Sequence, residues 1–156
     1  MKTAVESVRS LWVPLAGTHL LLPNVAVAEV ISHQPYETLS EGPDWLIGVL
    51  RWREVQVPVV SMERLFGLPG AAGPERSRIA VINSVIGDSG LPFYAIVTSG
   101  IPRLFSADEE ALGEALEREA DTPETVACRV RIGSEVALVP DMVAVQSLVA
   151  RHWDSL

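Results

Sequence analysis

The feature that most constrains the fold of this chain is a strand–turn–strand–helix pattern that occurs twice, 80 residues apart. The first copy reads GVLRWREVQVPVVSMERLFG over residues 48–67. Without a gap, Arg51 aligns with Arg131, and the residue that starts the helix, Ser61, aligns with Asp141. Repeats in solenoid proteins are about 20–50 residues long, so this longer spacing favours two related lobes that each contain one copy.

The chain length of 156 residues suits one domain, or two small lobes that share a core. Short strands, frequent turns and few long helices predict a mainly β fold built from small antiparallel barrels. We predict a single domain over residues 1–156, with lobe one at about 8–67 and lobe two at about 77–140. A final helix at 141–153 is expected to pack on the barrels, and the proline- and glycine-rich segment 68–75 is the expected connection.

Each copy of the pattern is expected to form a hairpin followed by a helix. In the first copy, the predicted strands are Trp45–Trp52 and Val55–Val60. Ser61 suits the N-cap of the helix, and Gly67 suits the left-handed position at its end.

In the second copy, the predicted strands are Val126–Ile132 and Glu135–Val139. Gly133-Ser134 between them suits a two-residue primed turn, and Asp141 is the expected N-cap of the final helix. The single cysteine, Cys128, lies in the first of these strands, where a small buried thiol is expected.

Three further elements follow from shorter local signals. The alternation in Asn24–Ile31 predicts a half-buried strand, and the composition of His33–Pro43 predicts a surface loop. Ser106 and Glu109 have the spacing of a capping box, and a narrow apolar face follows them. We therefore predict a helix over about residues 107–120.

The net charge of −8 is concentrated in one segment. Between Asp108 and Glu124 there are eight acidic residues and one basic residue, Arg118, whereas the rest of the chain holds twelve acids and eleven bases. Binding to nucleic acid requires a basic surface that neutralises phosphates. We therefore expect no nucleic-acid partner.

Leu11–Ala28 contains no charged residue, but prolines, a glycine and an asparagine interrupt it. No uninterrupted apolar run approaches the ~20 residues that a membrane-spanning helix needs. The amino terminus also lacks the compact apolar segment of a signal peptide. We expect a cytoplasmic protein with no direct membrane insertion, which reaches the inner membrane only through receptor arrays.

The residues that commonly carry catalysis or bind metals form no convincing constellation. The segment 87–90, with Ser89, looks like the nucleophile segment of a chymotrypsin-type protease, but Gly, Asp and Ser are also the ordinary residues of a hairpin turn. His19, His33 and His152 are scattered and have no metal-ligand spacing. We predict no enzyme, no cofactor and no metal, with a hydrolase using Ser89 as the alternative to be tested.

The remaining chemistry lies on the first hairpin, where Arg51, Trp52, Arg53 and Glu54 follow one another. Alternate residues of a regular strand share a face, which would place Arg51 and Arg53 together and Trp52 opposite. The simpler interpretation is that Trp52 is a core residue and that the two arginines are ordinary solvated charges. Arginines beside a tryptophan are also typical of interface hot spots.

These residues lie in a pattern that resembles the CheW-like domain, the scaffold of bacterial chemosensory arrays. The family pattern Gly-Val-Ile-Asn-Leu-Arg-Gly falls on residues 48–54, and Pro-Val-hydrophobic-Asp/Asn-Leu falls on residues 58–62. Upstream, Leu-Pro followed by Val-x-Glu-Val-Ile falls on residues 22–31. The resemblance extends over about residues 11–150.

The resemblance implies two five-stranded SH3-like β-barrels packed together with short helices, and a non-catalytic adaptor. One surface would bind the regulatory domain of a CheA-type histidine kinase, and another would bind the cytoplasmic tip of a chemoreceptor. Arg53, where the family keeps arginine, is the first expected partner contact. Glu29, where the family keeps glutamate, suits a structural or rim position, and Arg51, Trp52 and Glu54 complete the candidate partner-binding residues.

The chain departs from the family pattern at the hairpin. Glu54 replaces a glycine, so a positive φ costs more there, and Arg51, Trp52 and Ser61 replace Asn, Leu and Asp. The run Leu21–Glu29 and the Trp-Arg hairpin look most like the ChpC type of CheW-like protein. That type implies a type IV pilus chemosensory system and twitching motility.

A second class of function is a small β-barrel that binds a ligand. Trp12, Trp45 and Trp52 would line the pocket of such a module. Apolar pockets with a few polar groups are the usual form of small-molecule sites.

Overall fold

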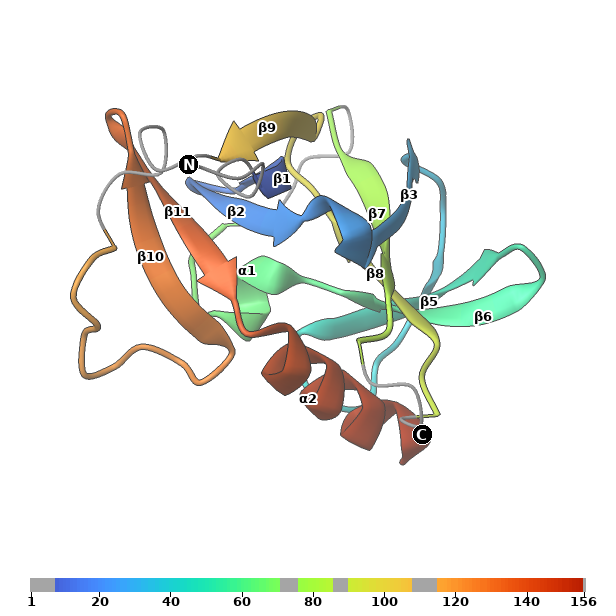
Figure 1. The fold of residues 1–156 in the computed structure, drawn as a ribbon. Helices are drawn as coiled ribbons and strands as arrows, with labels where there is room; N and C mark the ends of the chain where they lie inside the picture. Colours follow the sequence, from blue (N-terminus) through green and yellow to red (C-terminus); the bar gives the residue numbers. More distant parts are fainter. Residues whose placement is uncertain (1–7, 71–75, 86–89, 108–114, 156) are drawn as a thin grey trace.

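The computed structural model describes residues 8–70, 76–85, 90–107 and 115–155 (Figure 1). These residues form a mainly β structure with two short α-helices and one 3-10 turn. In chain order, the elements are β1 (Val8–Leu15), β2 (Thr18–Pro23), η2 (Asn24–Ala26), β3 (Val27–Ser32), β4 (Glu37–Thr38), β5 (Leu46–Trp52), β6 (Val55–Val60), α1 (Met62–Leu65), β7 (Arg78–Asn83), β8 (Phe93–Val97), β9 (Arg103–Ala107), β10 (Val126–Ile132), β11 (Glu135–Pro140) and α2 (Met142–Asp154).

The strands form two mixed sheets. The first has five strands in the order β10-β11-β2-β1-β9, and the second has six strands in the order β3-β7-β8-β6-β5-β4. Most neighbours are antiparallel, but β2 pairs with β11 and β6 pairs with β8 in parallel. The prediction of a mainly β fold with short helices is confirmed. Where two small five-stranded SH3-like barrels packed together were expected, the structure has two mixed sheets, one of five strands and one of six.

The two sheets interleave along the chain. The five-stranded sheet takes β1 and β2 from the first part of the chain and β9, β10 and β11 from the last part. The six-stranded sheet takes its six strands from between them. A division at about residues 8–67 and 77–140 therefore does not separate one sheet from the other.

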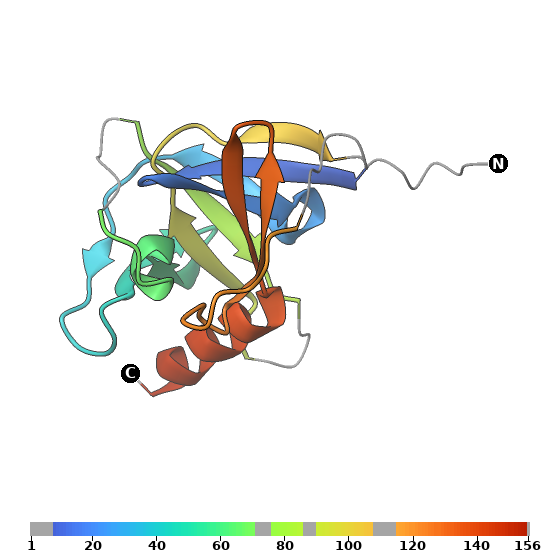
Figure 2. The ribbon, with the colours of Figure 1, turned by 90° about the vertical axis from the view of Figure 1, so that its left-hand side faces the viewer.

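One core cluster joins both sheets and α2. Its members come from β1 and β2, from β5 to β8, from β10 and β11, and from both helices. The fully buried ones include Leu20, Leu22, Leu46, Val60, Ile82, Ile96, Val145 and Val149. Burying one such side chain stabilises the fold by about 1.5–3 kcal/mol. In Figure 2, α2 continues from the lower end of the β10–β11 hairpin and lies along the base of the molecule.

The repeated pattern forms the same unit twice. Each element of the second copy begins 80 residues after its counterpart in the first: β10 after β5, β11 after β6, and α2 after α1. Both hairpins also have a register irregularity at the same place, between Leu46 and Gly48 in one and between Val126 and Cys128 in the other. The prediction of two copies of a hairpin-plus-helix unit is confirmed.

The caps of the two helices are equivalent as well. The Ser61 hydroxyl accepts a hydrogen bond from the Arg64 amide at 3.3 Å, and an Asp141 carboxylate oxygen accepts one from the Ala144 amide at 3.0 Å. α1 ends within four residues, and Gly67 follows it with a φ of +71°. The second hairpin turns at Gly133, which has a φ of +62°.

The predicted helix over about 107–120 is wrong in the residues that the structure describes. Ser106 and Ala107 belong to β9, where they pair with Arg9 and Val8 of β1, and Ala115 forms a bridge to Val130 of β10. At these described positions the backbone pairs with strands, and this pairing overrides a purely local helix signal. Residues 108–114, which include Glu109, lie outside the described residues.

Smaller differences occur at three other places. Asn24–Ala26 forms the 3-10 turn, so the strand predicted to start at Asn24 starts at Val27. The predicted surface loop at 33–43 contains the short strand β4, which pairs with β5. Cys128 is partly exposed rather than buried, and Ser89 lies outside the described residues.

Candidate functional site

The tip of the β5–β6 hairpin has an unusual backbone. Arg53 and Glu54 form its two-residue turn, and their φ values are +47° and +66°. Positive φ at both turn residues is the requirement of a type I′ turn, which matches the twist of a hairpin. Glycine or asparagine usually occupies such positions, because a left-handed conformation costs other residues about 1–2 kcal/mol. The hairpin thus keeps the turn geometry despite the loss of glycine at position 54.

Trp52 precedes this turn and is a core residue. It is 6% exposed and packs with buried residues of β5 to β8. Its ring meets that of Phe93 edge-on, with the ring centres 4.8 Å apart. The indole N–H donates a hydrogen bond of 2.9 Å to Glu29 Oε1, so this buried polar group has a partner.

Arg53 lies over the ring of Trp52. Its guanidinium carbon is 4.6 Å from the ring centre, and its Nη2 donates to Glu29 Oε1 at 3.3 Å. The expectation that Trp52 faces away from Arg53 is wrong, because the chain leaves the regular strand at Arg53 and turns back. The structure brings together Glu29, Trp52 and Arg53, which we call the tip cluster.

The tip cluster holds an exposed cation in a fixed place. The Arg53 side chain is 67% exposed and that of Glu29 is 40% exposed, so both reach solvent. The carboxylate and the ring fix the guanidinium from two directions. Arg51 and Glu54 are exposed next to it and lie outside the cluster. The arrangement can present charge to a partner.

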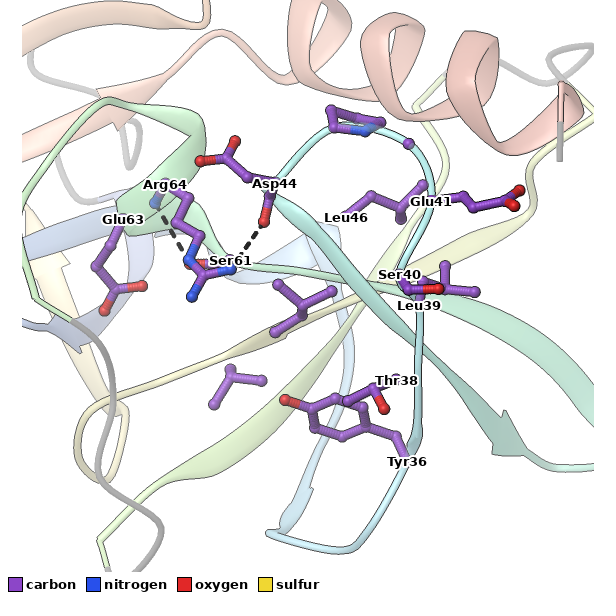
Figure 3. Close-up of a pocket in the computed structure, with 14 residues that line it drawn as sticks. Tyr36, Thr38, Leu39, Ser40, Glu41, Asp44, Leu46, Ser61, Glu63 and Arg64 are labelled. Carbon is purple, nitrogen blue, oxygen red and sulfur yellow. Dashed lines mark hydrogen bonds between the residues drawn. The ribbon is translucent and has the colours of Figure 1, made fainter.

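A pocket of about 490 Å³ lies at the other end of the same hairpin, between the segment before β5 and α1 (Figure 3). We call it the loop-one pocket. Its lining is Tyr36, Thr38, Leu39, Ser40, Glu41, Gly42, Pro43, Asp44, Leu46, Ile47, Ser61, Glu63, Arg64 and Val97. This volume is within the range of 300–1,000 Å³ that is usual for binding pockets.

The predicted tryptophan-lined pocket is wrong. Trp12, Trp45 and Trp52 are each less than 9% exposed and belong to three different core clusters. They therefore fill separate parts of the interior, and none of them lines the loop-one pocket.

Sequence reasoning missed the role of Glu63. It is only 2% exposed, and its Oε2 accepts hydrogen bonds from the Ala16 amide at 2.9 Å and the Ser99 hydroxyl at 3.3 Å. In the sequence, Glu63 is simply an acid in the first turn of a helix, where the helix dipole favours a negative charge. Its partners, distant in sequence, carry no local signal that would have found them.

Within the described ranges, no group of three or more His, Cys, Asp or Glu residues is placed to hold a metal ion. In the same ranges, no helix has the length and apolar character required to cross a bilayer.

Comparison with known families identifies the fold. The family model described as the CheW-like domain matches residues 9–149. The chain belongs to the CheW-like domain family. No curated protein matches the chain. The CheW-like structure is also similar to the crystal structure of scaffolding protein TtCheW from Thermoanaerobacter tengcongensis, with a TM-score of 0.73 and 14% sequence identity. The similarity covers 91% of this chain and 90% of that chain, and at this identity it shows the fold alone.

The predicted CheW-like identity is therefore confirmed. CheW-like proteins are non-catalytic scaffolds of chemotaxis signalling, which in general couple CheA-type kinases to chemoreceptors. Family membership thus places this chain among adaptors rather than among hydrolases.

Proposed function

We propose that this CheW-like protein is a cytoplasmic adaptor with two docking surfaces. One binds the regulatory domain of a CheA-type histidine kinase, and the other binds the cytoplasmic tip of a chemoreceptor. The observation that supports a docking role for the hairpin is the exposed, oriented guanidinium of Arg53 in the tip cluster.

The tip cluster has the physical properties of an interface anchor. Arginine and tryptophan are enriched among the residues that dominate binding energy. An arginine already held by a ring and a carboxylate loses less conformational freedom on binding, which lowers the cost of association. Arg51 and Glu54 extend the same surface with further charge, and Trp52 and Glu29 act by holding Arg53 in place.

Arg53→Glu should weaken binding of the kinase regulatory domain or of the receptor tip by roughly tenfold or more, which corresponds to ~1.4 kcal/mol. Affinity is to be measured with purified partners. Arg131→Glu is the matched control, because Arg131 is also exposed and lies on the second hairpin. Circular dichroism must show that both variants are folded. Unchanged affinity of a folded Arg53→Glu variant for both partners would remove Arg53 from the interface.

We further propose that the partners belong to a type IV pilus chemosensory system that controls twitching motility. The support is the resemblance of the run Leu21–Glu29 and of the Trp-Arg hairpin to the ChpC type. In a cell with both pilus and flagellar kinases, the tagged protein should co-purify with the pilus kinase. Preferential recovery of the flagellar kinase would contradict this assignment.

A further inference from the structure

The segment that precedes β5 and the segment that precedes β10 are equivalent loops. Loop one, residues 38–47, and loop two, residues 118–127, lie 80 residues apart. Each closes with a backbone hydrogen bond of 3.1 Å, from Leu46 N to the Pro43 oxygen in one and from Val126 N to the Pro123 oxygen in the other. Figure 1 shows the hairpins that follow them reaching opposite sides of the molecule.

The two loops also have acids at the same positions. Glu41 in loop one corresponds to Asp121 in loop two, and Asp44 corresponds to Glu124. All four of these side chains belong to exposed residues. The two loops therefore share the backbone hydrogen bond that closes them and the positions of two acidic residues.

Loop two folds around a guanidinium of its own. Arg118 donates hydrogen bonds to the carbonyl oxygens of Val126 at 2.8 Å and Pro123 at 3.0 Å. Longer contacts of 3.4 Å reach the oxygens of Thr122 and Ala127. The planar group satisfies the inward carbonyls of the loop with several of its five N–H donors.

Loop one has no cation of its own. Its sequence, TLSEGPDWLI, contains no lysine or arginine. The loop-one pocket lies there instead, and nine of its fourteen lining residues belong to loop one. Thr38 stands at the position of Arg118 and lines this pocket, so the first copy of the unit has a pocket lined by a threonine where the second copy has an arginine.

The chemistry of the walls suits a cation. Glu41 and Asp44 line the loop-one pocket beside a single arginine, Arg64, whose guanidinium donates to the Asp44 carbonyl oxygen at 3.1 Å. The Glu63 carboxylate is already bonded to the Ala16 amide and the Ser99 hydroxyl, so the charge available to a ligand comes from the two exposed acids. In Figure 3, Arg64 and Asp44 lie at one side of the pocket and Tyr36 lies at the other. An aromatic ring is a favourable surface for the flat face of a guanidinium.

The position of Tyr36 is set by the backbone beneath it. A Cβ atom at Gly48 would overlap the Tyr36 ring and the carbonyl oxygen of Glu37. Only glycine therefore lets the ring pack directly on β5, at the edge of the pocket. This gives a physical reason for the glycine that begins the hairpin motif.

We propose that the loop-one pocket receives an arginine side chain from a protein partner, in the way that loop two encloses Arg118. The inference rests on the proposed adaptor function, which supplies a protein as the source of the arginine. A lysine should fit less well, because its compact ammonium group lacks the planar fork that reaches several carbonyl oxygens at once.

The pocket itself is tested without any partner, by titrating the isotope-labelled protein with N-acetyl-L-argininamide and following backbone amide NMR signals. Saturable shifts are expected in residues 38–47 and 61–64. Glu41→Gln/Asp44→Asn should weaken this binding roughly fivefold, the size expected from the loss of two exposed charges near the ligand. Asp121→Asn/Glu124→Gln is the matched control and should leave it unchanged. Absent or non-saturable shifts, or equal binding of N-acetyl-L-lysinamide, would overturn the proposal.

The source of the arginine is tested with purified kinase regulatory domain and receptor tip. Glu41→Gln/Asp44→Asn should reduce affinity for one of them, whereas Asp121→Asn/Glu124→Gln should not. Suppose that the wild-type protein binds the kinase domain or the receptor tip, and that the pocket variant has the same affinities as the wild type. The arginine then does not come from these proteins, and the proposal fails. If wild-type protein binds neither, the adaptor function fails instead, and the titration separates the two results.

Discussion

At the scale of single residues, the tip of the first hairpin combines strain with exposure. Arg53 and Glu54 both adopt positive φ without being glycine, and the resulting turn places the Arg53 guanidinium over Trp52. Backbone strain of this kind persists only where surrounding contacts hold it. Here the contacts are the Trp52 ring and the Glu29 carboxylate.

Glu54→Gly should therefore stabilise the protein by up to about 1 kcal/mol. Relief of a left-handed conformation that costs about 1–2 kcal/mol exceeds the extra freedom that glycine gives the unfolded chain. Urea denaturation measures the change. Glu54→Ala serves as the control, since it removes the charge and keeps the Cβ atom. A lower denaturation midpoint for Glu54→Gly than for wild type would contradict a strained turn.

At the scale of elements, local chemistry was enough to predict the repeated unit. Its strand ends, turn residues and caps depend on neighbours in sequence, and the structure has them where Ser61 and Asp141 indicated. The helix expected over 107–120 had equally good local signals. In the described residues at the start of that range it failed, because the pairing of β9 with β1 depends on residues more than ninety positions away.

The N-cap of α2 offers a test at this scale. Asp141→Ala should destabilise the protein by about 1 kcal/mol, because the Ala144 amide loses its side-chain acceptor. Asp141→Asn should retain most of the stability, since an asparagine also caps helices. Thermal unfolding of both variants gives the comparison. Equal losses for alanine and asparagine would show that the cap hydrogen bond is not what matters.

At the scale of the whole molecule, the contacts between residues distant in sequence were beyond sequence reasoning. Glu29, Trp52 and Arg53 were each marked as candidates, but their meeting was not foreseen, because Glu29 is 23 residues from Trp52 and 24 from Arg53. The loop-one pocket was missed for a similar reason, since its walls come from the loop before β5, from α1 and from β8.

Substitution of Glu63 tests how much the contact between α1 and the β1–β2 turn contributes to the stability of the fold. Glu63→Ala should destabilise the whole fold by about 1–3 kcal/mol, because the Ala16 amide in the β1–β2 turn loses its acceptor. Glu63→Gln keeps an oxygen at that place and should cost less. Unfolding followed by tryptophan fluorescence and by far-ultraviolet circular dichroism should show one coincident transition. Separate transitions for the two signals would mean that the sheets unfold independently.

The interleaved sheets have a consequence for how this chain matures on the ribosome. The amino-terminal strand β2 finds one of its two neighbours in β11, and the Thr18 hydroxyl contacts a carbonyl oxygen 118 residues further along. During translation, the five-stranded sheet thus stays incomplete until β11, residues 135–140, has been made. Until then, one edge of the nascent β1–β2 hairpin lacks its partner strand.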